Sequence, residues 1–183
     1  VMVATDPVSG EPVYFGDEVW RKNRDVFTAV IKASSSLPFI ARAVDVEGRM
    51  LYDGGIADPI PVRKALADGC ERVVVVLTKH ASYRVKPFRQ RRTARWVYRR
   101  YPRFIEALER RDQVYNETMA FLRRLEEEGR AFIIRPSKEL PAGRTERDSA
   151  KLDALYKLGE SDAAELMPRL RAWIAAADVV HQS

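Results

Sequence analysis

The chain has 183 residues and a formal net charge of +6, with 46% apolar and 32% charged residues. This length and balance are typical of a globular domain with its own core and exclude a disordered chain. No apolar run reaches the ~18 residues that a membrane-spanning helix needs. The single cysteine, Cys70, excludes an internal disulfide and a multi-cysteine zinc site. We expect it to be buried and the protein to be cytoplasmic.

The first half of the chain alternates strand and helix patterns. Strands are predicted at residues 1–5 and 11–15, with a turn between them, and a helix is predicted at 25–32, where one face is apolar. Residues 41–52 indicate two strands with a turn at Glu47 and Gly48. The chain starts within a strand and has no signal-peptide pattern. We therefore expect an upstream part of the same domain to be missing.

The middle of the chain continues with a helix and a buried strand. Asp58 is the predicted N-cap of a helix at 60–67, and Gly69 is its C-cap. The apolar run at 72–77 does not alternate, which predicts a strand buried on both faces, as in a parallel sheet. This helix and strand form half of a βαβ unit. Two helices at 91–101 and 103–128 and a strand at 130–135 follow.

The C-terminal segment has a different pattern, because only polar linker and helices are predicted there. One helix covers residues 148–158 and ends at Gly159, and Ser161 caps a second helix that Pro168 kinks or delays. The sequence thus predicts a first domain at 1–136 and a helical extension at 137–183.

Asp53-Gly54-Gly55 is the most informative motif. Asp53 ends a predicted strand, and open α/β sheets place ligand sites at such edges. Gly54 and Gly55 remove side-chain bulk, so another group can approach the carboxylate closely. On local grounds alone, a hairpin or loop turn is the favoured explanation of an Asp-Gly pair.

Three blocks together carry a family resemblance. The serine-rich turn at 33–39, the segment Leu51–Val62 around Asp53 and the opening strands at 3–15 resemble patatin-like phospholipases. The resemblance implies an α/β fold, here a partial three-layer sandwich with a mostly parallel sheet and flanking helices. The helical extension is similar to that of some bacterial members. The family implies a Ser-Asp dyad that hydrolyses phospholipids or other acyl-ester lipids without a metal or cofactor.

By this resemblance Asp53 is the dyad carboxylate, supported by Gly54 and Gly55. A carboxylate with an ordinary pKa of ~3.9 is a weak base at neutral pH, so it must contact the serine directly in a water-poor site. The nucleophile of the family lies in a G-x-S-x-G motif, which this sequence lacks. We therefore expect the serine upstream of residue 1 and no hydrolase activity in this chain alone.

Other serines and the histidines are weaker candidates. Ser34, Ser35 and Ser36 are predicted to be turn and cap residues, and the near-match at 159–163 joins two helices. His80 follows a predicted strand and could complete a Ser-Asp-His triad, although a surface-loop position fits the dyad better. His181 carries no argument, and neither histidine has a metal partner at a suitable spacing.

A basic stretch without any Asp or Glu runs from residue 72 to 105. Its arginines alternate with aromatic residues, and the helix within it is predicted to contact an anionic membrane through Arg91, Arg95, Trp96 and Arg99. A solvated, partly paired face is the simpler alternative, and nucleic-acid binding is the weakest. The alternative function for the chain is thus a non-catalytic module that docks on a membrane or partner through residues 84–104. A partial domain is also expected to bind its missing part or a second copy of itself.

Overall fold

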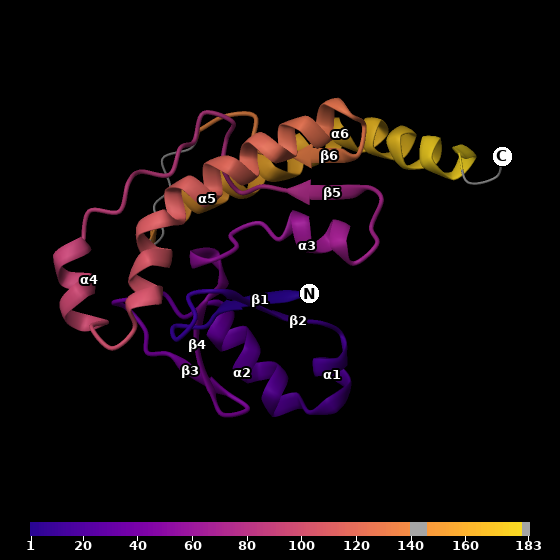
Figure 1. Ribbon diagram of the computed structural model, residues 1–183. Coiled ribbons are helices and arrows are strands. Elements are labelled where there is room, and N and C mark those ends of the chain that lie inside the picture. The colour runs from indigo at the N-terminus through magenta and orange to yellow at the C-terminus, as the bar shows by residue number, and fades with distance from the viewer. Residues whose placement is uncertain (140–145, 181–183) are drawn as a thin grey trace. The chain divides into compact units, whose positions relative to one another are not determined.

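The chain forms a mixed α/β structure of two units that interleave along the sequence, as the computed structural model in Figure 1 shows. The structure describes residues 1–139 and 146–180. Unit 1 comprises Val1–Pro61 and Arg84–Phe121, and unit 2 comprises Val62–Tyr83 and Leu122–Ser183.

Unit 1 is built on a four-stranded sheet with the strand order β2-β1-β4-β3. Every pairing in this sheet is antiparallel. Short connections reverse the chain between β1 and β2 and between β3 and β4, and β1 and β4 join the two hairpins. Glu47 and Gly48 have φ values of +51° and +84°, which is the geometry of a two-residue hairpin turn and confirms the prediction there. The elements of unit 1 are β1 (Met2–Thr5), β2 (Pro12–Phe15), α1 (Glu18–Lys22), α2 (Arg24–Ser34), β3 (Val44–Val46), β4 (Arg49–Asp53), the short 3₁₀-helix η1 (Gly54–Ile56), α4 (Arg91–Val97) and most of α5 (Pro102–Glu127).

Two apolar clusters hold unit 1 together. In the first, Val30 and Ala33 of α2 pack against Ala4 and Leu51 of the sheet. In the second, Phe104 of α5 is fully buried and its ring stacks on Tyr52 with centroids 4.8 Å apart. Burial of one such phenylalanine contributes about 1.5–3 kcal/mol. The first turns of α5 are therefore part of the core beneath the end of β4.

Unit 2 contains a two-stranded parallel sheet between helices (Figure 1). Its elements are α3 (Val62–Ala67), β5 (Val73–Val76), β6 (Ala131–Ile134), α6 (Ser149–Val180) and the end of α5. β5 and β6 pair in register from Val73 opposite Ala131 to Val76 opposite Ile134. The parallel pairing of this valine-rich strand is as predicted.

The predicted burial of β5 on both faces is wrong. Val74 and Val76 are 44% and 70% exposed, whereas Val73 and Val75 are half-buried. Successive side chains of a strand point to opposite faces of the sheet, so Val74 and Val76 share one face. On β6, Phe132 lies opposite Val74, and it contacts Trp173 of α6. α6 therefore covers this face at β6 and leaves the two valines of β5 exposed. A two-stranded sheet is too narrow to bury all the valines of its edge strand.

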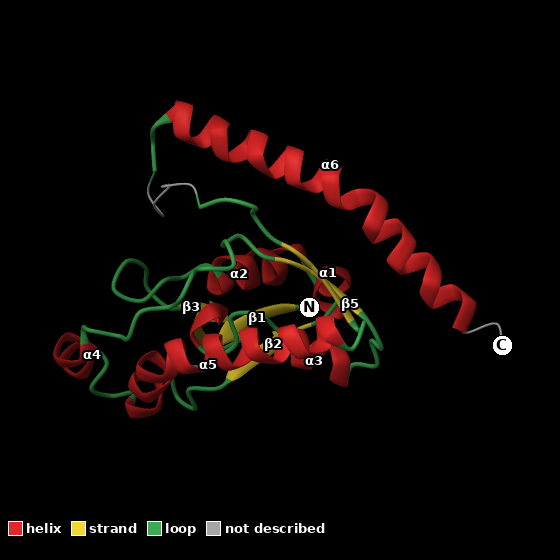
Figure 2. Cartoon of the chain, turned by 90° about the horizontal axis from the view of Figure 1, so that it is seen from above, coloured by secondary structure: helices red, strands yellow, loops and turns green. Residues whose placement is uncertain are grey.

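α6 is one continuous helix rather than two, so the predicted stop at Gly159 is wrong. A glycine inside a helix costs only about 1 kcal/mol relative to alanine, and contacts beyond it offset this cost: Asp162 accepts a hydrogen bond from the Ser137 N–H at 2.9 Å. Pro168 also lies inside the helix. It cannot donate to the carbonyl four residues earlier, and α6 is bent along its length (Figure 2).

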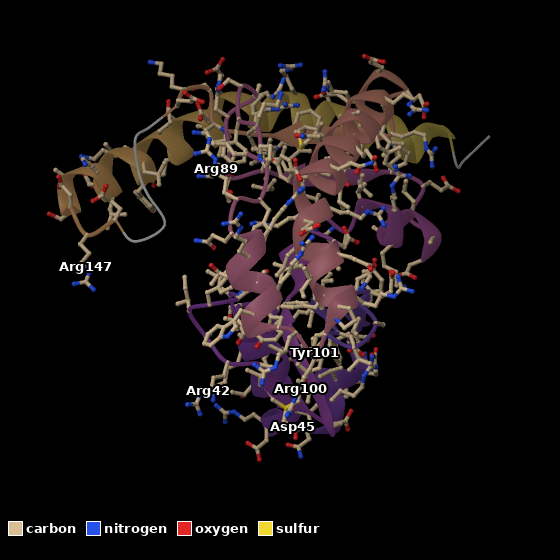
Figure 3. All side chains as sticks on the ribbon, turned by 60° about the vertical axis from the view of Figure 1, so that its left-hand side comes forward. Arg42, Asp45, Arg89, Arg100, Tyr101 and Arg147 are labelled. Carbon is tan, nitrogen blue, oxygen red and sulfur yellow. The ribbon has the colours of Figure 1, made fainter. Side chains whose placement is uncertain are left out.

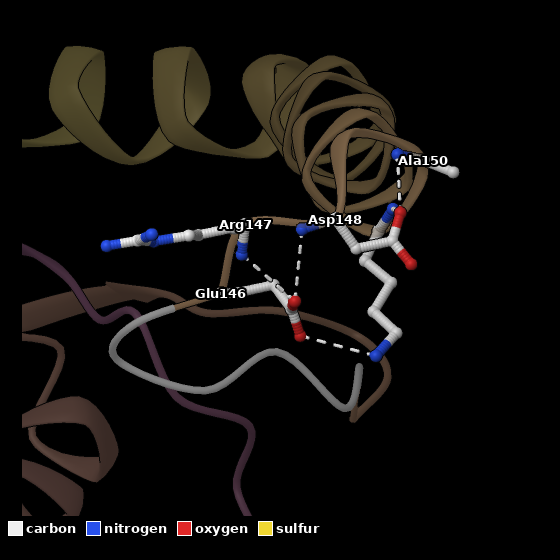
Figure 4. Close-up of polar contacts among 5 residues, drawn as sticks. Glu146, Arg147, Asp148 and Ala150 are labelled. Carbon is white, nitrogen blue, oxygen red and sulfur yellow. Dashed lines mark hydrogen bonds and ion pairs between the residues drawn. The ribbon is translucent and has the colours of Figure 1, made fainter.

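The start of α6 is capped by side chains. Asp148 accepts from the N–H of Ala150 at 2.9 Å, as an N-cap residue does. Glu146 accepts from the backbone N–H groups of Arg147 and Asp148 and from Lys151 (Figure 4). The bond from Asp148, with those from Lys151 and Arg147, lowers the pKa of Glu146.

Two further local predictions are wrong. Asp58 does not cap α3, because Pro61 keeps the residue before it out of helical backbone and the helix begins only at Val62. Cys70 is exposed, since it lies in the turn that follows α3. The mixed α/β class and the helical C-terminal region are confirmed, whereas the domain boundary at residue 136 stays a prediction.

Candidate functional site

Asp53 is the last residue of β4, and three separate segments of unit 1 converge on it. β1 pairs with β4 so that Ala4 lies opposite Asp53. The N–H of Asp53 donates to the Ser36 carbonyl at 3.0 Å, and its own carbonyl accepts from the buried Thr5 hydroxyl at 2.8 Å. The opening strand, the serine-rich turn and the Asp-Gly-Gly block, which are separate in the sequence and together carry the resemblance, thus meet at Asp53.

Gly54 lets the backbone of β1 come close to the turn that follows Asp53. A Cβ atom at residue 54 would lie 2.3 Å from the Val3 carbonyl oxygen and 2.5 Å from its carbon. Such distances are sterically forbidden, and the atoms belong to backbone that cannot rotate away. The absence of a side chain at this position is therefore what lets β1 pass directly beside the Asp53 turn.

The turn after Asp53 is fixed by a helix distant in sequence. Residues 54–56 form η1, in which the Gly54 carbonyl accepts from the Asp58 N–H at 2.9 Å. The Gly55 carbonyl accepts from Nε of Arg111 in α5 at 3.0 Å. Arg111 was not predicted from the sequence, because it lies 56 residues further along the chain and no local pattern marks it.

The two oxygens of the Asp53 carboxylate have different environments. Oδ1 accepts a 2.7 Å hydrogen bond from the Gly55 N–H, which sets the orientation of the half-buried side chain. For Oδ2 no hydrogen bond is found in residues 1–139 and 146–180. One oxygen holds the group in place, and the other can accept a proton or a hydrogen bond.

Two tyrosines near this turn resist ionisation. Burial raises the pKa of Tyr52 to about 12, and the nearby Tyr98 adds to the effect. Burial also raises the pKa of Tyr14, whose hydroxyl donates to Asp58 Oδ2 at 2.8 Å. Both phenols stay neutral at physiological pH. The neutral Tyr14 hydroxyl can therefore donate its hydrogen bond to Asp58, whose side chain has a structural role.

Ser34 is the last residue of α2, and the next two serines have structural roles. The Ser35 hydroxyl donates to the carbonyls of Ile31 and Lys32, and the Ser36 hydroxyl donates to Lys32. These bonds satisfy carbonyls at the C-terminal end of α2, as the sequence predicts. Ser161, in the near-match at 159–163, lies within the continuous helix α6.

His80 lies in the loop after β5, in unit 2, whereas Asp53 is in unit 1. Its Nδ1 is 2.9 Å from the Ser82 hydroxyl, which in turn donates to Glu139. This is a local loop contact of the kind that the surface-loop interpretation predicts. His181 lies outside the described residues.

The four residues proposed for membrane contact do not share one surface: Arg91, Arg95 and Trp96 lie in α4, and Arg99 lies in the turn after it. Arg91 and Arg95 approach Glu109 Oε1 at 3.7 and 3.6 Å, which is ion-pair distance but longer than a hydrogen bond. Trp96 is 73% exposed, and Arg99 is also exposed. Figure 3 marks Arg89 before α4 and Arg100 after it, both with exposed side chains.

A cavity of about 300 Å³ in unit 1 lies beside the residues that follow η1. Its lining includes Gly10, Ile56, Arg103 and Arg110. Asp53 is not among the lining residues, so this cavity does not mark the carboxylate.

No group of three or more His, Cys, Asp or Glu side chains in the described ranges could hold a metal ion. Among the helices of the same ranges, none combines the length and apolar character that crossing a bilayer requires.

Comparison with known proteins identifies two segments of the chain. Residues 3–66 match the patatin-like phospholipase family, and residues 101–175 match a domain of unknown function, DUF6363. The chain is 30% identical over 132 residues to the uncharacterized protein YjjU of Escherichia coli (strain K12). It is 40% identical over 60 residues to uncharacterized NTE family proteins of Mycobacterium tuberculosis (strain ATCC 25618 / H37Rv) and Mycobacterium bovis.

These relatives are much longer than the matched parts. The match covers 71% of this chain but 37% of the Escherichia coli protein. The mycobacterial matches cover 33% of this chain and 15% of each relative.

Proposed function

Because this chain carries part of a patatin-like phospholipase domain, we propose that its parent protein is a serine lipid acyl hydrolase in which Asp53 is the general base. The observation that carries this proposal is the carboxylate itself. One oxygen is oriented by the Gly55 N–H and the other is left to accept a proton. The backbone of Asp53 is fixed as well, because its N–H donates to the Ser36 carbonyl and its carbonyl accepts from the Thr5 hydroxyl.

The proposed reaction uses a serine from the remainder of the domain, upstream of residue 1. Its hydroxyl oxygen attacks the carbonyl carbon of an acyl ester while Asp53 takes the hydroxyl proton. The proton then passes to the departing alcohol, which leaves an acyl-enzyme. Water that gives its proton to Asp53 releases the fatty acid and regenerates the serine. A phospholipid or another acyl-ester lipid is the proposed substrate.

Asp53→Asn in the full-length protein tests this role. A positioned general base contributes roughly 100-fold to 10,000-fold to the rate, so hydrolysis of a p-nitrophenyl acyl ester should fall at least about 100-fold. Asparagine keeps the size and can still accept from Gly55, so the unfolding temperature should change little. Asp58→Asn is the matched control, since that carboxylate is bonded to Tyr14, and it should retain activity.

Two results would contradict the proposal. An active Asp53→Asn enzyme removes the dyad assignment. If the 183-residue chain alone hydrolyses the ester and loses this activity on Asp53→Asn, the nucleophile lies within the chain and its upstream position is wrong.

A further inference from the structure

We propose that the outward face of α4 and the turn after it dock on an anionic lipid bilayer through Trp96, Arg92, Arg99 and Arg100. We call these four residues the α4 docking face. The residues predicted from the sequence were Arg91, Arg95, Trp96 and Arg99. The α4 docking face keeps Trp96 and Arg99 and contains Arg92 and Arg100 in place of the other two. It does not depend on the catalytic role of Asp53.

The inward side of α4 is defined by its buried residues. Ala94 is fully buried and Tyr98 is 5% exposed. The ring of Tyr98 packs edge-on against Phe104, and its hydroxyl accepts from the Phe39 N–H at 2.9 Å. These contacts fix how the helix is rotated about its axis.

Trp96 lies on the opposite side. A helix turns about 100° per residue, so Trp96 lies about 200° around the axis from Ala94. Its 73% exposure agrees with this position. Arg92 is four residues earlier and shares this face, while Arg99 and Arg100 lie in the turn that follows the helix.

The arginines around α4 differ in whether they form ion pairs. Arg91 and Arg95 flank Glu109, and Arg103 pairs with Glu106. No ion pair is found for Arg92, Arg99 or Arg100 within the part of the chain that the structure describes. Three arginines without an ion pair in the described residues therefore lie close to the exposed Trp96 in the sequence, whereas Arg91 and Arg95 share the carboxylate of Glu109.

This combination fits the surface of an anionic membrane. Arginines next to anionic headgroups gain electrostatic attraction, and tryptophan favours the headgroup region because it has an apolar ring and a polar N–H. α4 has seven residues, too few to span or insert deeply, so the contact is superficial. Seven residues also present no extended groove that would follow a nucleic-acid backbone.

Arg92→Gln and Arg91→Gln form a matched pair for co-sedimentation with vesicles. Each variant removes one positive charge from neighbouring positions, but only Arg92 belongs to the α4 docking face. Binding to vesicles of phosphatidylcholine and phosphatidylserine should fall roughly fivefold for Arg92→Gln and much less for Arg91→Gln. Trp96→Ala should also weaken binding, and Trp96→Phe should restore part of it. The three substituted positions, 91, 92 and 96, are exposed, so the unfolding temperature of each variant should stay unchanged.

The outcomes separate this proposal from its competitors and from the catalytic one. Equal binding to vesicles of phosphatidylcholine alone, or equal losses in the two arginine variants, would overturn it. Salt-dependent binding to a DNA duplex that Trp96→Ala abolishes, without binding to vesicles, would assign the face to nucleic acid. Asp53→Asn should leave vesicle binding intact, so loss of activity and loss of docking are independent results.

Discussion

Gly54→Ala tests whether close backbone approach at residue 54 holds the Asp53 turn. The added Cβ would lie 2.3 Å from the Val3 carbonyl oxygen. Since Val3 belongs to β1, which pairs with both β2 and β4, the strand must shift as a whole or the turn must open. Overpacking of a core lowers the free energy of unfolding by about 1–3 kcal/mol. Because the added Cβ meets backbone atoms that cannot rotate away, we expect a loss of about 3 kcal/mol for Gly54→Ala. For a chain of this size the unfolding temperature should fall by roughly 6–12 °C.

Two other glycines provide controls for thermal unfolding followed by circular dichroism. At Gly159, inside α6, no atom lies within 4 Å of an added Cβ, so Gly159→Ala should stabilise by about 0.5–1 kcal/mol. At Gly55 the Cβ would lie 3.0 Å from Asp53 Oδ1, so Gly55→Ala should displace the carboxylate and reduce hydrolysis more than stability. The steric argument is refuted if Gly54→Ala unfolds at the wild-type temperature, or if Gly159→Ala loses as much stability.

Two further predictions follow from single contacts. Arg111→Gln removes the bond to the Gly55 carbonyl. If the full-length protein has the proposed activity, its kcat should fall roughly tenfold with KM nearly unchanged, and Arg111→Lys should restore part of it. An equal loss in the exposed neighbour Arg110→Gln would contradict a positioning role for Arg111. Burial opposes ionisation of Asp6, but the hydrogen bond from Arg49 and the bonds from Val8 and Ser9 outweigh it and lower the pKa below its ordinary value of 3.8. Because the folded pKa is lowered, this stabilisation is present above pH 3.8 and is lost as the pH falls through the folded pKa. Unfolding temperatures measured from pH 7 to pH 3 should therefore fall less in Arg49→Ala than in the wild type, and parallel curves would refute the assignment.

Local chemistry was sufficient to predict several features of the fold and the site. The hairpin turn at Glu47 and Gly48 has a left-handed backbone that its own residues favour. The end of β4 at Asp53 and the hydroxyl bonds of the serine turn also follow from neighbouring residues. Each of these features depends on contacts within a few positions of the chain.

The wrong predictions concern features that depend on distant packing. The valine run of β5 has the composition of a fully buried strand, but its burial depends on the width of the sheet and on where α6 lies. Gly159 is a good helix terminator by itself, yet the contact of Asp162 with Ser137 favours a continuous helix. No sequence pattern predicted Arg111, because its hydrogen bond to the Gly55 carbonyl forms only once α5 packs beside that residue.

The two segments with known relatives are joined within one core. Tyr52 and Gly55 belong to the patatin-like match, and Phe104 and Arg111 belong to the DUF6363 match. Phe104 stacks on Tyr52, and Arg111 donates to the Gly55 carbonyl. Removal of residues 101–121 would uncover the aromatic ring next to Asp53 and release the turn that follows it. The first part of the DUF6363 segment therefore supports the Asp53 turn, and a patatin-like domain cut at the end of its own family match would lack this support.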